Sequence, residues 1–147
     1  AISLGMLITD NTALDTTDAV MQSFANIELL IFQNKQEMAI HKLNEILNMY
    51  EYHSVTDEVY WLLSKLELEA GRVEPAIEYL DKILATYAYD ILADEAAFKK
   101  AEIIERYQDD IEQAKELYQQ FLIEYPGSLY VAEARKRYRK LRGDFVN

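Results

Sequence analysis

Three segments of the chain share one pattern of apolar and polar positions. They read KQEMAIHKLNEILNMY (35–50), RVEPAIEYLDKILATY (72–87) and DIEQAKELYQQFLIEY (110–125). In the second segment, apolar residues stand at i, i+1, i+4, i+7, i+8 and i+11 counted from Ala76, which is the spacing of one face of an amphipathic helix. Each segment therefore predicts a helix with a single apolar face.

The three segments align column by column, because residue 35 corresponds to 72 and 72 to 110, at steps of 37 and 38. The shared columns are Ala39/Ala76/Ala114, Leu47/Leu84/Leu122, Tyr50/Tyr87/Tyr125, Leu43/Leu80/Tyr118 and Ile46/Ile83/Phe121. The stretches before them repeat as well, since the same step aligns Phe24, Trp61 and Phe98. Self-similarity at such a period is typical of stacked helix pairs.

The links inside each unit predict tight turns. Asn34 and Gly71 occupy equivalent positions, and both residue types tolerate the left-handed conformation that ends a helix. The third copy has one extra residue there, and its Asp110 and Gln113 resemble a capping box. The repeating unit is therefore predicted to be helix, tight turn, helix.

This organisation predicts one all-α domain over residues 1–147, a right-handed α-solenoid of about three helix pairs with a C-terminal capping helix. Thr17 and Asp18 can start the first helix, and Pro126-Gly127-Ser128 can end the sixth and cap the seventh. The predicted parts are an N-terminal remnant (1–16), three repeats (17–50, 55–88 and 92–126) and the capping helix (128–142). Leu4, Leu7 and Ile8 have helical spacing, so we interpret the remnant as the tail of a further repeat helix.

The small residue Ala76 five positions after Gly71, together with the closing Pro126, resembles the tetratricopeptide repeat (TPR) family. The resemblance covers about residues 18–142 and is closest to the degenerate repeats of bacterial envelope-assembly lipoproteins. It implies a helix-pair solenoid that binds proteins, here as a C-terminal fragment of a larger TPR protein. The chain departs from the family pattern in its period, which exceeds the usual 34 residues or so. Its aromatic column also lies one residue after the family's early Trp position.

Composition agrees with this fold and narrows the chemistry. With 4 Gly, 2 Pro and half of its residues hydrophobic, the chain favours helices over a turn-rich sheet or disorder. It has no Cys, which excludes disulfides, zinc thiolates and a cysteine nucleophile. Its two histidines, His41 and His53, belong to no metal-binding motif, and no phosphate-binding or hydrolase motif is present. We therefore expect no catalysis, no metal and no cofactor.

The candidate binding surface lies on the first helices of the pairs, which line the concave side of such a stack. Phe24, Trp61 and Phe98 either form an aromatic ladder along a groove or pack between neighbouring pairs, and aromatic residues at helical spacing favour packing. The resemblance places four charged residues beside them, namely Glu58, Lys65, Glu95 and Glu102. Such a groove favours a peptide with apolar anchors and basic character. A self-associating segment, as in a homodimer, is the alternative.

One polar residue interrupts the apolar columns. Glu67 aligns with Leu30 and Ile104, so the helical wheel places it on the core face of its helix. Because an unpaired buried carboxylate is too costly, we expect Glu67 to be paired with a cation or open to water.

The net charge of −11 is unevenly distributed, because residues 1–109 carry all of the excess negative charge. A nucleic-acid or anionic-surface contact would therefore rest on the last helix alone. Its cations are Arg135, Lys136, Arg137, Arg139, Lys140 and Arg142. We interpret this helix first as a solvated terminal cap docked through Ala132, Ala134, Tyr138 and Leu141, and second as an anionic-surface site. We expect a protein partner, with neither nucleic acid nor a membrane span, in either the bacterial cytoplasm or the periplasm.

Overall fold

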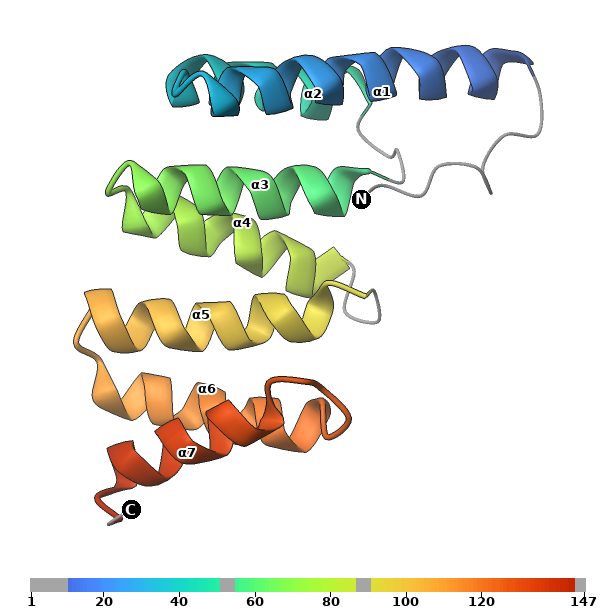
Figure 1. The fold of residues 1–147 in the computed structure, drawn as a ribbon. Helices are drawn as coiled ribbons and strands as arrows, with labels where there is room; N and C mark the ends of the chain where they lie inside the picture. The colour runs from blue at the N-terminus through green and yellow to red at the C-terminus, as the bar shows by residue number, and fades with distance from the viewer. Residues whose placement is uncertain (1–10, 51–54, 87–90, 145–147) are drawn as a thin grey trace.

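The computed structural model describes residues 11–50, 55–86 and 91–144, and these residues form seven helices (Figure 1). The helices are α1 (Asn11–Phe32), α2 (Gln36–Met49), α3 (Thr56–Glu69), α4 (Val73–Thr86), α5 (Ala93–Tyr107), α6 (Ile111–Glu124) and α7 (Val131–Arg142). Each helix packs against the next one in the chain, so the molecule is a single stack ordered from α1 to α7. This confirms the predicted all-α solenoid of helix pairs closed by a last helix.

The turns within the pairs have the predicted backbone geometry. Asn34 and Gly71 adopt left-handed φ angles of 60° and 83°. The residue after each turn donates its backbone N–H five residues back, from Lys35 to Leu30 at 2.8 Å and from Arg72 to Glu67 at 2.9 Å. The two turns are thus equivalent in hydrogen bonding as well as in sequence.

The third turn uses a different residue for the same purpose. Asp109 takes the left-handed conformation, with a φ of 52°. The side chain of Asp110 then accepts a hydrogen bond from the backbone N–H of Gln113 at 3.1 Å, as the capping spacing predicts.

Two helices begin elsewhere than predicted. α1 begins at Asn11, ahead of Thr17, so the segment interpreted as a remnant is partly the first turns of α1. Leu4, Leu7 and Ile8 lie outside the described residues. α7 begins at Val131, three residues after Ser128. The Ser128 hydroxyl instead donates to Asp94 at 2.6 Å and accepts from the N–H of Tyr130 at 3.1 Å, which holds residues 126–130 in a turn against α5.

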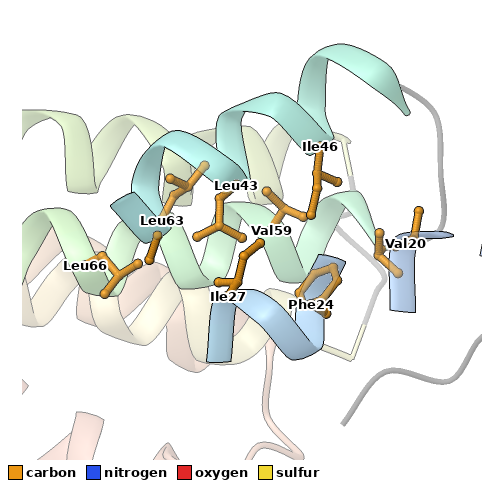
Figure 2. Close-up of a cluster of buried hydrophobic side chains, with 10 residues drawn as sticks. Val20, Phe24, Ile27, Leu43, Ile46, Val59, Leu63 and Leu66 are labelled. Carbon is orange, nitrogen blue, oxygen red and sulfur yellow. The ribbon is translucent and has the colours of Figure 1, made fainter. Parts of the chain in front are cut away.

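The core follows the repeated columns. Ala39, Ala76 and Ala114 are fully buried, where a small side chain lets the two helices of a pair approach closely. Figure 2 shows the first core cluster, in which side chains from three successive helices point toward one another. These are Val20, Phe24 and Ile27 from α1, Leu43 and Ile46 from α2, and Val59, Leu63 and Leu66 from α3. Each helix pair is therefore completed by the first helix of the next pair.

Glu67 is buried and paired with a cation, one of the two expected arrangements. Its side chain is 10% exposed, and its Oε1 accepts hydrogen bonds from Arg72 Nε at 3.0 Å and Nη2 at 2.7 Å. The same guanidinium reaches Glu37 of α2 at 2.8 Å. One arginine therefore neutralises a core carboxylate and ties the first helix pair to the second.

Candidate functional site

A groove of about 720 Å³ runs along the face formed by the first helices of the three pairs. It is lined by Met21, Phe24, Ala25 and Glu28 of α1, by Glu58, Trp61 and Leu62 of α3, and by Ile91, Leu92 and Glu95 at the start of α5. The groove is continuous across three helices because these positions recur at the repeat step. We call this hollow the acidic groove.

The charge of the acidic groove has one sign. Glu28, Glu58 and Glu95 each come from a different first helix, and among the described residues no Lys or Arg lines the hollow. Its remaining walls are mainly apolar, and Ile91 is 87% exposed at its edge. A hollow lined by apolar side chains and three carboxylates can hold an apolar side chain next to a positive charge.

The three aligned aromatic residues lie in different environments. Phe24 and Phe98 are in the core, with 4% and 7% of their surface exposed. Phe98 stacks on Tyr130 at a ring-centroid distance of 4.9 Å and does not line the acidic groove. Trp61 is half-buried and lines the groove beside Phe24. Of the three aromatic residues, Phe98 therefore serves the core alone. Phe24 is a core residue that also forms part of the groove wall, and Trp61 is accessible from the groove.

A second, smaller hollow of about 160 Å³ adjoins Trp61 on its other side, and we call it the lysine pocket. It is lined by Trp61, Ser64, Lys65, Leu68, Glu69 and Lys99. Lys65 is exposed, whereas Lys99 contacts Glu102 at 3.0 Å. The structure therefore brings Glu58, Trp61, Lys65 and Glu95 to one face of the stack.

Glu102 lines neither hollow. Its side chain is only 14% exposed and contacts three cations, Lys99 at 3.0 Å, Arg137 at 3.1 Å and Arg106 at 3.5 Å. This carboxylate joins α5 to α7 through ion pairs.

The basic run of α7 divides into an inward and an outward part. Arg137 is 16% exposed and contacts Glu133 at 2.9 Å, Glu102 at 3.1 Å and Glu105 at 3.4 Å. Its guanidinium also lies 5.8 Å from the Phe98 ring centroid. Arg142 pairs with Asp144. The cations exposed on the outer face are Arg135, Lys136, Arg139 and Lys140.

Arg137 closes a buried polar network. The Tyr118 hydroxyl is inside the core and donates a hydrogen bond to Glu105 at 2.6 Å. Burial, and then this bond to a carboxylate, raise the pKa of Tyr118 well above its usual range. α7 docks through Ala134, Tyr138 and Leu141 as predicted, but Ala132 is exposed and Val131 packs on the core in its place. A helix that begins at Val131 turns its first residue inward.

The two histidines belong to no motif in the sequence, and only His41 lies in the described residues. His41 contacts Glu45 at 2.9 Å, while Glu37 is held by Arg72. His53 lies outside the described residues. Within residues 11–50, 55–86 and 91–144, no three His, Asp or Glu side chains are grouped as metal ligands would be. No helix in these ranges is long and apolar enough to cross a membrane.

Sequence reasoning missed part of the groove. Glu28 lies one turn after Phe24 on the same helix face and aligns with Lys65. The repeat alignment could therefore have identified Glu28 as a groove residue. Ile91 and Leu92 precede the helix start, where no periodic pattern marks them.

Comparison with known protein families identifies the helix pair α5–α6. A family model described as tetratricopeptide repeat matches residues 95–128, which run from the first turn of α5 through α6 to the turn before α7. No curated protein matches the chain. The matched segment is one helix pair in a series of pairs that share its columns and its packing. The match and the repeated helix pairs together support assigning the chain to the tetratricopeptide repeat family.

Proposed function

We propose that this chain is a non-catalytic scaffold that binds a protein segment on the concave face of its repeat stack. The observation that carries the proposal is the acidic groove, which is lined by Glu28, Glu58 and Glu95 together with apolar side chains and Trp61. Tetratricopeptide repeats serve in general as protein-interaction scaffolds, which agrees with a groove built from first helices and the residues just before α5.

Each part of the groove has a separate role in this proposal. Trp61 offers a large apolar surface that is already fixed by the helix on which it stands, so covering it costs little conformational entropy. The carboxylates select for a basic residue next to the anchor and speed its approach. Affinity then comes mainly from the apolar contact and selectivity from the charges.

Affinity capture with matched variants tests this proposal. The native chain, a Glu58→Lys/Glu95→Lys variant and a Glu116→Lys control are each used to capture proteins from a lysate of the source organism. Glu116 is exposed on α6, away from the residues that line the groove. The proposal expects a partner that the native chain and the control retain and the groove variant loses. A partner retained equally by all three would show that the groove is not the binding site.

A structural role, in which the repeats only extend or dimerise a parent protein, is a second candidate. The first pair favours it, because Leu29, Phe32, Met38 and Met49 are all at least half exposed on α1 and α2. Light scattering at two concentrations separates this candidate, since self-association raises the apparent mass with concentration. A constant monomer mass would exclude dimerisation through these repeats.

The outer face of α7 supports a third candidate, the binding of an anionic surface. Arg135, Lys136, Arg139 and Lys140 are exposed there on an otherwise acidic protein. Retention on heparin that falls with salt, and that is lost when these four are neutralised, is the required result. No retention by the native chain would exclude this candidate.

A further inference from the structure

Trp61 separates two hollows of opposite charge on one face of α3. The acidic groove lies toward Glu58, and the lysine pocket lies toward Lys65. Glu58, Trp61 and Lys65 stand at i, i+3 and i+7, so all three lie on the same side of the helix. A segment that covers Trp61 therefore lies between a negative and a positive region.

The next first helix repeats this order of charges. Glu95 lines the acidic groove near the start of α5, and Lys99, one turn later, lines the lysine pocket. In Figure 1, α3 and α5 begin at the same side of the stack and run in the same direction. The charge thus changes from negative to positive along both helices in parallel, and the face as a whole is bipolar.

The two lysines of the lysine pocket can still attract an anion, although carboxylates lie nearby. Lys65 is exposed and makes no ion pair within the described part of the chain. Lys99 does contact Glu102, but that carboxylate is shared with Arg106 and Arg137. A single negative charge divided among three cations leaves Lys99 available to a further anion. Glu69 at the edge of the pocket only partly offsets the two lysines.

We infer that this face binds a protein segment of mixed charge. A basic residue lies among Glu28, Glu58 and Glu95, an apolar side chain covers Trp61, and an acidic residue lies between Lys65 and Lys99. The inference rests on the proposed concave-face binding. It specifies that the bound segment carries both a basic and an acidic residue, where the proposal alone asks only for a basic one. A uniformly basic segment would bring a positive charge against the two lysines, which like-charge repulsion disfavours.

The helix also sets the spacing of those charges. Glu58 and Lys65 are seven residues apart, so at 1.5 Å per residue their backbone positions are separated by about 10 Å. An extended segment rises about 3.3 Å per residue, so its basic and acidic residues stand roughly three or four positions apart. The apolar residue falls between them.

Synthetic peptides read out by Trp61 fluorescence test the inference. Trp61 is the only tryptophan of the chain, so tryptophan-free peptides built around a central Leu leave the signal to the protein. The peptides carry Lys on one side and Glu on the other, Lys on both sides, or Glu on both sides. We expect the mixed-charge peptides to bind about tenfold more tightly than either uniform set at low salt.

Charge reversal at the lysine pocket provides the decisive comparison. Lys65→Glu should shift the preference to peptides with Lys on both sides, whereas Lys140→Glu on the outer face of α7 should leave the order unchanged. Thermal denaturation followed by circular dichroism checks that both variants are folded like the native chain.

The possible failures point to different conclusions. If peptides with Lys on both sides bind the native chain as tightly as the mixed ones, and Lys65→Glu changes nothing, the bipolar inference is wrong while concave-face binding stands. If no peptide of any pattern binds, the inference is also wrong, and the capture experiment with the groove variant decides separately whether this face binds a partner.

Discussion

Arg72 donates two hydrogen bonds to one oxygen of the buried Glu67 carboxylate, at 2.7 and 3.0 Å. The hydrogen bond to Glu67, and then the one to Glu37, raise the pKa of this guanidinium above its usual range. Glu67 occupies a column that is apolar in the other repeats, where Leu30 and Ile104 stand. The second repeat has thus replaced an apolar contact by a polar clamp that reaches back to α2.

Removing the cation should destabilise the protein. Arg72→Ala leaves the Glu67 carboxylate buried without a partner, so we expect a clearly lower melting temperature in thermal denaturation followed by circular dichroism. The double variant Glu67→Leu/Arg72→Ala restores the column to an apolar residue and should recover most of the loss. Melting of the single variant at the native temperature would show that the clamp contributes nothing.

Two neighbouring cations of α7 should behave differently when truncated. Arg137→Ala removes the ion pairs to Glu102 and Glu105 and uncovers part of the Phe98 ring, so it should cost about 2 kcal/mol of unfolding free energy. Lys136→Ala, on the exposed face, should change stability by less than about 0.5 kcal/mol. Urea denaturation measures both values.

Arg137→Lys supplies the control for charge alone. A lysine keeps the positive charge but cannot span several carboxylates with a planar fork, so only part of the loss should be recovered. Equal costs for Arg137→Ala and Lys136→Ala would mean that α7 is docked by its apolar face alone.

The turn at Gly71 tests the left-handed backbone geometry. Gly71 has a φ of 83°, and a Cβ added there meets no atom within 4 Å, so Gly71→Ala introduces backbone strain without a clash. We expect a loss of about 1 kcal/mol in urea denaturation. Gly127→Ala is the matched control, because Gly127 has equal space and no left-handed φ, and it should be neutral or slightly stabilising. Identical results for the two variants would contradict this account of the turn.

Much of the fold could be predicted because the same apolar pattern and turn-forming residues recur in each repeat. The burial of Ala76 and Leu80 could be predicted from helical periodicity. The turns at Asn34 and Gly71 could be predicted from residue type. Glu67 could be identified as an exception because its column is otherwise apolar. These signals come from local periodicity, residue type and the alignment of the repeats, all of which are available in the sequence without a structure.

The features that could not be predicted from the sequence depend on contacts between residues far apart in the chain. α7 begins at Val131 because Ser128 bonds to Asp94, a residue 34 positions earlier. Arg137 turns inward because Glu102 and Glu105 of another helix receive it, and a helical wheel gives the direction of a Cα–Cβ bond but not the reach of a long side chain. The acidic groove likewise depends on how three first helices are placed side by side.

Photo-cross-linking from within the groove tests the central claim most directly. p-Benzoylphenylalanine replaces Leu62, which lines the acidic groove, or Glu116 on α6, and each protein is irradiated in a lysate of the source organism. The account predicts a discrete adduct from position 62 that is absent from position 116 and that disappears when Glu58→Lys/Glu95→Lys is added. Adducts that form only from position 116, or that form from position 62 regardless of the groove charges, would contradict it.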